Sequence, residues 1–210
     1  HNTFNNKNKG VSPSLVIHQA TEYPIIIEKK GNGKNNKITI EVNWKPPDSN
    51  TFKLNVDGFV KRNPGPEGLT GVIRVHHGNW VVGFTEHTPL TNPIRAELQA
   101  MRRGVALAVE YRLSPLEINS NSLEAIKMLT KNNLIYNDLI VECRFLMTKL
   151  EVTKAEHVFR EQNRVADKPS KEGVKNVLFD EPNFLTTATI CMQKEVDADM
   201  LGTKFTRVRK

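Results

Sequence analysis

The stretch 52–58, with the sequence FKLNVDG, constrains the fold of this chain more than any other. Its apolar residues at 52, 54 and 56 fall on one face of a β-strand, and its polar residues at 53, 55 and 57 fall on the other. The apolar face can be buried in a core, and Asp57 then stands at the end of the strand, just before Gly58. We therefore predict a sheet whose edge presents a carboxylate, which needs partners from elsewhere in the chain.

Two more strands and a long helix are predicted next. Strands over 69–75 and 80–85 follow a turn at 63–68 that is rich in glycine and proline, which predicts three consecutive antiparallel strands. From Pro93 onward, apolar residues recur at the spacing of a helix, at Ile94, Leu98, Met101 and Val105. This stripe predicts a helix with one buried face.

Glu97 lies beside this apolar stripe, one turn into the predicted helix. If the helix packs on the sheet that carries Asp57, the two carboxylates converge. The alternative is a solvent-exposed glutamate that stabilises the helix N-terminus through the helix dipole.

The second half of the chain alternates between predicted strands and helices. In order, they are a strand over 116–120, a helix from 123, a helix over 137–150, a strand over 151–158 and a last helix after the polar turn 160–163. Asn121 can cap the first of these helices, with Glu124 three residues later. Cys143 falls on the inward side of the second, where a thiol is typical of a packed core. The last helix carries Asp167, a third acid.

Charge and cysteine content narrow the function only slightly. The net charge of +7 is spread along the chain, so charge alone fits a nucleic-acid partner and an ordinary solvated surface about equally. No apolar run approaches the roughly 18 residues needed to span a bilayer, so no membrane partner is predicted. The two cysteines make no disulfide framework and favour an intracellular compartment, the nucleus or the cytoplasm.

Composition also suggests how the chain is divided. Residues 1–43 are predicted to be a flexible N-terminal segment and linker, with a short strand over 38–42. Residues 44–175 hold the core elements. Residues 176–210 are predicted to be a C-terminal tail that docks in part, and the strand-like stretch 184–190 within it has no evident partner.

The order of these elements resembles ribonuclease H, and more narrowly the plant ribonuclease H-like domains associated with reverse transcriptase-derived retroelement sequences. The matching stretches are WKPP at 44–47, KLNVDG at 53–58, GVIR at 71–74, AEL at 96–98 and HVFREQNRVAD at 157–167. The resemblance covers about residues 44–175. It implies a mixed α/β (α+β) fold with a five-stranded mixed sheet, in which three antiparallel strands are followed by parallel additions and flanked by helices.

The resemblance also implies a chemistry. Such enzymes use two Mg²⁺ ions, or Mn²⁺, to hydrolyse the RNA strand of an RNA/DNA hybrid. The implied catalytic and metal-binding residues are Asp57, Glu97, Asn121 and Asp167. Asp57 would bridge the ions, Asp167 would hold the one on the nucleophile side, and Glu97 would hold the other.

Contacts with the nucleic acid are implied for Arg160, Asn163 and Gly58. Arg160 lies in the loop where bacterial relatives carry a proton-shuttling histidine, and an arginine cannot readily act as a base. The implied partner is an RNA/DNA hybrid or RNA, bound by a monomer.

Two departures from the family pattern bear on this chemistry. The family has Thr-Asp-Ser where this chain has Ser120-Asn121-Ser122, so four formal negative charges become three. Asparagine caps a helix about as well as aspartate does, so the change can spare the fold and weaken the metal site. The family also has Ala-Asp-x-Leu-Ala where this chain has Pro169 and Ser170. A proline inside a helix can kink it, at about 3 kcal/mol, and displace Asp167.

Two functions therefore stay open. The first is a metal-dependent endonuclease that cuts the RNA strand of a hybrid at a reduced rate. The second is a catalytically inactive hybrid- or RNA-binding module, or a retroelement relic, which still recognises phosphates and 2′-hydroxyls.

Overall fold

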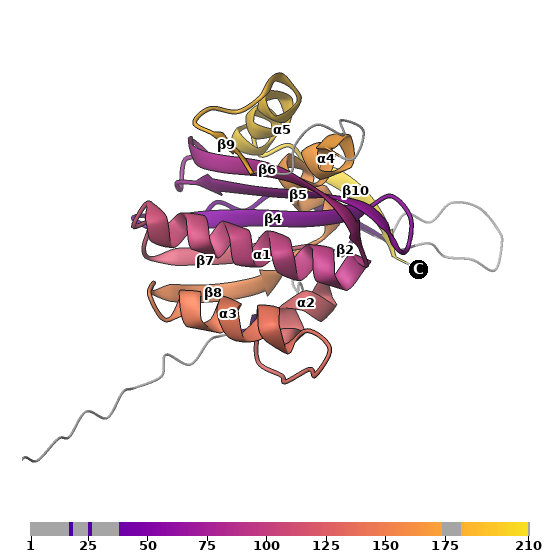
Figure 1. Cartoon of the computed structure of the whole chain (residues 1–210). Coiled ribbons are helices and arrows are strands. Elements are labelled where there is room, and N and C mark those ends of the chain that lie inside the picture. Colours follow the sequence, from indigo (N-terminus) through magenta and orange to yellow (C-terminus); the bar gives the residue numbers. More distant parts are fainter. Residues whose placement is uncertain (1–16, 19–24, 27–37, 174–181, 210) are drawn as a thin grey trace, which may run out of the picture.

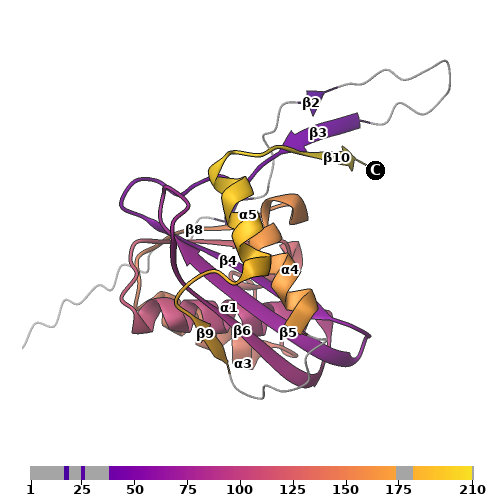
Figure 2. The same ribbon diagram turned by 90° about the horizontal axis from the view of Figure 1, so that it is seen from above.

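The computed structural model describes residues 17–18, 25–26, 38–173 and 182–209. Apart from 17–18, 25–26 and 38–43, the flexible segment and linker predicted over 1–43 lies outside these residues. The described elements form two sheets with helices on both faces of the larger one (Figures 1 and 2). No described helix combines the length and the apolar character that crossing a membrane requires.

The larger sheet has seven strands in the order β1-β8-β7-β4-β5-β6-β9. Its strands are β1 (Ile17–His18), β4 (Phe52–Val60), β5 (Gly65–Arg74), β6 (Trp80–Thr91), β7 (Leu116–Ser120), β8 (Val152–His157) and β9 (Asn183–Leu185). Strands β4, β5, β6 and β9 pair antiparallel, whereas β7, β8 and β1 are added in parallel. The predicted mixed sheet of five strands is confirmed, and two short edge strands, β1 and β9, extend it.

The helices cover the two faces unequally. Their bounds are α1 (Pro93–Glu110), α2 (Leu123–Met128), α3 (Asn137–Met147), a 3₁₀ turn η1 (Arg160–Gln162), α4 (Arg164–Gly173) and α5 (Ile190–Met200). Helix α1 packs on β4 and β5 and is covered in turn by α3. Helix α4 packs on the opposite face of the same two strands, and α5 packs on α4, as Figure 2 shows.

Helix α1 forms where the sequence predicts it. Asn92 caps its first turn by accepting a hydrogen bond from the Arg95 N–H at 3.0 Å, and Pro93 occupies the start, where no backbone donor is needed. The apolar stripe of Leu98, Met101 and Val105 is fully buried in the main core.

Strand β4 separates two different interiors. Leu54 and Val56 pack under α1 in the main core, as the alternating pattern predicts. The polar face is buried as well, because α4 and α5 cover it. On that face, Lys53 pairs with Glu117 at 2.9 Å, and burial lowers the pKa of Lys53 in spite of this partner. Asn55 accepts a hydrogen bond from the Arg74 guanidinium at 2.9 Å.

The smaller sheet pairs strands from the N-terminal and C-terminal parts of the chain. It has three strands, in the order β10-β3-β2, with bounds β2 (Ile25–Ile26), β3 (Ile38–Val42) and β10 (Phe205–Arg209). The strand predicted over 38–42 is thus present, and β10 pairs with it antiparallel. The strand-like stretch 184–190 finds its partner in β6, although only 183–185 form β9 and Ile190 already begins α5.

In the second half of the chain, the predicted cap of α2 is wrong and the predicted burial of Cys143 is confirmed. Helix α2 begins at Leu123, as predicted, but its cap is Ser122, whose hydroxyl accepts from the Ala125 N–H at 3.3 Å. Asn121 is therefore not the cap, and its side chain is available to the site. Cys143 is fully buried on α3, and burial raises the pKa of its thiol to about 12.

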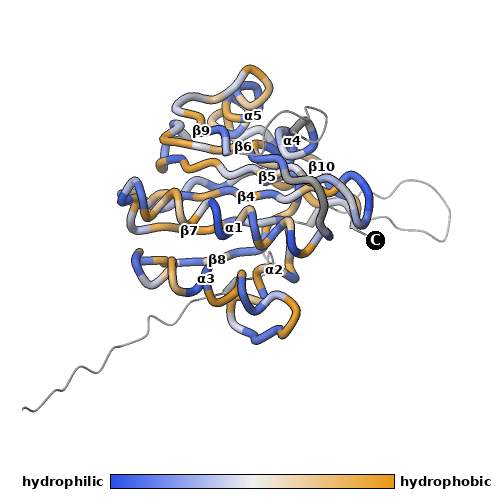
Figure 3. The backbone as a smooth tube through the Cα atoms, in the orientation of Figure 1, coloured by the Kyte–Doolittle hydropathy of each residue, from blue (hydrophilic) through white to orange (hydrophobic). Residues whose placement is uncertain are grey.

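Hydrophobic residues follow the central strands and the inward helix faces, which Figure 3 shows in orange. The loop between α2 and α3 is also orange in Figure 3, and its hydrophobic residues Leu134 and Ile135 are exposed.

Candidate active site

At one edge of the larger sheet, strands β7 and β8 end beside Asp57 of β4, to which β7 is parallel. The strand that carries Asp57 was predicted to end there, but β4 runs on to Val60, because Gly58, Phe59 and Val60 still pair with β5. Strand β7 pairs with β4 so that Val56 lies opposite Ser120, and the next residues along the two strands are Asp57 and Asn121. Strand β8 pairs with β7 so that His157 lies opposite Ser120. The edge therefore carries one carboxylate, one amide and one imidazole.

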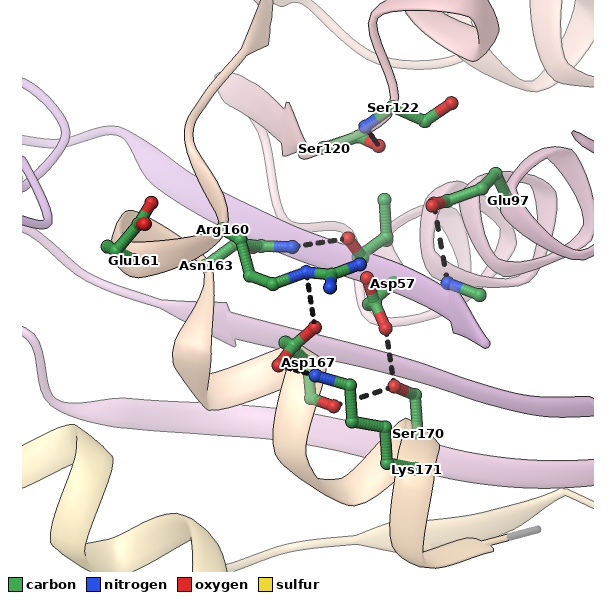
Figure 4. Close-up of polar contacts among 12 residues, drawn as sticks. Asp57, Glu97, Ser120, Ser122, Arg160, Glu161, Asn163, Asp167, Ser170 and Lys171 are labelled. Carbon is green, nitrogen blue, oxygen red and sulfur yellow. Dashed lines mark hydrogen bonds and ion pairs between the residues drawn. The ribbon is translucent and has the colours of Figure 1, made fainter. Parts of the chain in front are cut away.

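Asp57 is buried at this edge, with 2% of its surface exposed. The Ser170 hydroxyl, from α4, donates to its Oδ2 (Figure 4). Burial raises the pKa of Asp57 and the nearby charge of Asp167 raises it further, while hydrogen bonds from Ser170 and Asn121 lower it. The carboxylate is thus held among polar groups in a site that resists its ionisation.

Glu97 reaches the same edge from α1, because α1 crosses β4 at Gly58. A Cβ at Gly58 would lie 2.3 Å from the backbone carbon of Ala96, so only glycine permits this approach. The Gly58 N–H donates to Glu97 Oε2 at 3.3 Å. Burial raises the pKa of Glu97 well above its usual range, and the charge of Asp57 adds to this effect. The backbone N–H of Gly58, implied above as a contact with nucleic acid, is therefore bonded to Glu97 in this structure.

Asn121 lies beside Asp57, and its side chain lowers the pKa of the Asp57 carboxyl. The Oδ1 of Asn121 is buried and has no hydrogen-bond partner among the described residues. A buried carbonyl oxygen of this kind normally has a donor or a cation beside it. Asn121 thus offers a neutral acceptor at the corner of the site where the family pattern has a carboxylate.

Asp167 comes to the site from α4 and is 6% exposed. Its Oδ1 lies 3.0 Å from Nε of Arg160, and its Oδ2 is paired with the ammonium group of Lys171. Pro169 lies inside α4, but the helix runs unbroken from Arg164 to Gly173, so the proline does not interrupt it before Asp167. Figure 4 shows both cations directed at the Asp167 carboxylate.

Asn163 precedes α4 and is fully buried. Its amide donates to the carbonyl of Val56 at 2.8 Å, and its Oδ1 accepts from Asn55 at 3.0 Å. The side chain therefore ties α4 to β4 from inside the protein. Its carbonyl, not its side chain, receives the first helical hydrogen bond of Asp167, at 2.9 Å.

His157 is a residue that the sequence analysis missed. It lines a cavity of about 280 Å³ next to the carboxylates, together with Asn121, Val158, Phe159, Arg160, Glu161 and Arg207. Burial lowers the pKa of His157 below its ordinary value of 6.5, so the imidazole is neutral at pH 7 and can accept a proton. Its position at the end of the predicted strand 151–158 was a signal that could have identified it.

The side chains as placed do not fit a pair of Mg²⁺ ions. Over residues 38–173 and 182–209, no three Asp, Glu, His or Cys side chains form a group that could hold one ion. The oxygens that the ions would need are bonded to the Ser170 hydroxyl and to the cations of Lys171 and Arg160. Mutually repelling carboxylates require positive charge nearby, and these two cations supply it.

The sequence profile of the reverse transcriptase-like family matches residues 55–173, which is more than half of the chain. An Arabidopsis thaliana protein with a provisional ribonuclease H name is 29% identical over 142 residues. That match covers 66% of this chain but only 22% of the Arabidopsis protein.

Solved structures show the same fold. The ribonuclease H1 of the archaeon Halobacterium salinarum superposes with a TM-score of 0.56 at 22% identity, covering 60% of this chain and 99% of that one. The compost-derived LC11 ribonuclease H1, solved in complex with an RNA/DNA hybrid, also has a TM-score of 0.56, at 20% identity, covering 61% of this chain and 99% of that one. This chain therefore belongs to the reverse transcriptase-like family and contains a ribonuclease H-like domain.

Proposed function

We propose that this chain binds RNA/DNA hybrids through the edge that carries Asp57, and that its two-metal hydrolysis of the RNA strand is impaired. One observation carries the proposal. The family's acidic positions converge from β4, α1, β7 and α4, but Asn121 supplies an amide and the α4 side chains Ser170 and Lys171 bind the remaining aspartates. The site thus keeps the architecture of the family's active site without a free set of metal ligands.

Binding of a hybrid is supported by the fold and by the exposed charge at the edge. A ribonuclease H1 of the same fold was solved with a hybrid bound. The Arg160 side chain is 61% exposed beside the site, and a guanidinium in this position suits a backbone phosphate. We also propose an origin in a plant retroelement, because the matching family is named reverse transcriptase-like and the Arabidopsis relative is a plant protein.

Impaired hydrolysis follows from charge. Divalent cations such as Mg²⁺ and Mn²⁺ bind most strongly to clustered carboxylates, and an amide oxygen contributes no net negative charge. Lys171 and Arg160 neutralise Asp167 from within the protein, so an incoming ion must displace them or share the carboxylate with them. Both effects weaken the metal site and leave the hybrid-binding surface in place.

The proposal is tested with a labelled RNA/DNA hybrid and Mg²⁺, using the parent chain and Asn121→Asp. We expect the parent to bind the hybrid and cleave it slowly or not at all, and the variant to cleave at least about tenfold faster, because a ligand charge is restored. Asn132→Asp, which adds the same charge on an exposed loop, is the matched control and should behave like the parent. Equal cleavage by parent and Asn121→Asp would refute the impairment, and absence of hybrid binding would refute the function.

A further inference from the structure

The cavity beside the candidate active site is lined in part by a strand outside the residues that the family profile matches. Its lining joins the end of β8 and the turn η1 to Arg207 of β10. The family profile ends at residue 173, so Arg207 belongs to the part of the chain that this family does not account for. The guanidinium groups of Arg160, on η1, and Arg207, on β10, therefore line the same cavity.

Arg207 is held in a fixed orientation. Its guanidinium lies 4.4 Å from the centre of the Phe159 ring, and Nη1 pairs with the Glu161 carboxylate at 2.9 Å and 3.2 Å. Both contacts with Glu161 use Nη1, so among the described residues Nε and Nη2 have no hydrogen-bond acceptor. A planar guanidinium that is stacked and partly free is a suitable donor for a phosphate.

Asn121 also lines the cavity, but its Oδ1 is buried and presents almost no surface to a ligand. The groups that can bind a ligand in this cavity of about 280 Å³ are therefore the two guanidinium groups, which are phosphate donors.

We propose that this cavity binds one backbone phosphate of the hybrid. Arg207 of β10 and Arg160 of η1 donate to that phosphate. The proposal rests on hybrid binding, as proposed above, and adds that the C-terminal strand β10 takes part in it. Glu161 competes with the phosphate for Arg207 and so moderates the affinity.

The test is the salt dependence of hybrid binding, measured by fluorescence anisotropy in EDTA so that no strand is cut. A side chain that neutralises one phosphate contributes about one to the slope of log K against log salt concentration. We expect Arg207→Gln to weaken binding several-fold and to reduce this slope by about one. Lys204→Gln is the matched control, because Lys204 precedes the same strand but pairs with Glu41 outside the cavity. It should leave the slope unchanged.

Two further variants guard against a folding defect. Glu161→Gln should tighten binding, since it frees Arg207, and no loss of structure would produce that result. Arg207→Lys should keep the slope, because it keeps the charge, and lose part of the affinity with the planar fork. Melting temperatures of all variants identify any that are unfolded.

The outcomes separate this proposal from the proposed function. If Arg207→Gln and Glu161→Gln bind like Lys204→Gln, the phosphate site is wrong although hybrid binding stands. If the parent binds no hybrid, the proposed function itself fails.

Discussion

At the scale of single residues, Gly58 has the most demanding position in the site. Strand β4 meets α1 there so closely that a Cβ would lie 2.3 Å from the carbonyl carbon of Ala96 and 2.5 Å from the backbone nitrogen of Glu97. Backbone atoms in a packed helix cannot move aside as a flexible side chain can. The glycine therefore sets the distance between the strand that carries Asp57 and the helix that carries Glu97.

This contact predicts a large effect for a small substitution. Gly58→Ala should lower the free energy of unfolding by about 3 kcal/mol, the upper part of the range for overpacked cores, as measured by urea denaturation. Gly202→Ala is the control: its new Cβ meets nothing within 4 Å, and only its left-handed backbone, with φ of 65°, is strained. It should cost about 1 kcal/mol. Equal losses in the two variants would mean that the contact with α1 does not constrain the site.

The sequence could identify the site residues whose position follows from an element's period. Asp57 falls on the polar face of an alternating strand, and Glu97 lies one turn into an amphipathic helix, so both could be assigned to an element before the structure was known. The contacts of Lys171 with Asp167 and of Ser170 with Asp57 could not be predicted from the sequence. Lys171 follows Asp167 at a spacing that permits an ion pair in any helix, and nothing in the sequence shows that such a pair forms inside a site. The approach of Ser170 to Asp57 depends on how α4 packs on β4.

At the scale of elements, helix α4 is held between the sheet and α5 by Glu195. This carboxylate is buried, and it pairs with Arg164 and Lys168 of α4. Burial alone would raise the pKa of Glu195, but the hydrogen bonds and charges of Arg164 and Lys168 outweigh it and lower the pKa below its ordinary value of 4.5. The ion pairs thus favour the charged form and stabilise the folded state at neutral pH.

Glu195→Gln should therefore destabilise the protein in a pH-dependent way. The two basic partners are about a third exposed and stay partly solvated, so we expect a loss of about 1–2 kcal/mol at pH 7, or roughly 3–6 °C in Tm. A lowered pKa contributes stability above the unfolded value of 4.5 and loses it as the pH falls through the native value. The difference from the parent should accordingly shrink well below pH 4.5.

The control is Glu142→Gln, since Glu142 is half exposed and pairs with Arg102 at the surface. It should change Tm little at any pH. If Glu195→Gln melts with the parent at pH 7, or if the difference is as large in acid, Glu195 does not hold α4 in the way described.

Long elements with a clear period could be predicted, and short ones with distant partners could not. Helix α1 and strands β4 to β8 follow from patterns within the sequence. Strand β9 has three residues and pairs with β6, and β10 pairs with β3 from the other end of the chain. Pairings of this kind depend on the tertiary structure, which no local pattern encodes.

At the scale of the whole molecule, the C-terminal elements complete the second interior. Arg74 of β5 is fully buried, pairs with Asp199 of α5 at 2.8 Å and stacks over Trp44 at 4.0 Å. Val72 packs with Met192 and Val196 of the same helix. The polar face of β4 and β5 is thereby enclosed, which explains why a strand face with lysine, asparagine and aspartate is buried in this protein.

The same elements connect the fold to the candidate active site. Glu195 and Asp199 fix α5 against α4 and β5, and α4 carries Asp167, Ser170 and Lys171 into the site. The whole molecule thus holds a ribonuclease H-like edge in which the acidic side chains already have partners from their own chain.

The most direct test of this account is the affinity of the site for a divalent cation, measured by calorimetric titration with Mn²⁺ at pH 7. We predict that Asn121→Asp binds at least about tenfold more tightly than the parent, that adding Ser170→Ala to it tightens binding further, and that Asn132→Asp binds like the parent. Equal affinities for the parent and Asn121→Asp would show that the missing charge does not limit the metal site, and would contradict the central claim.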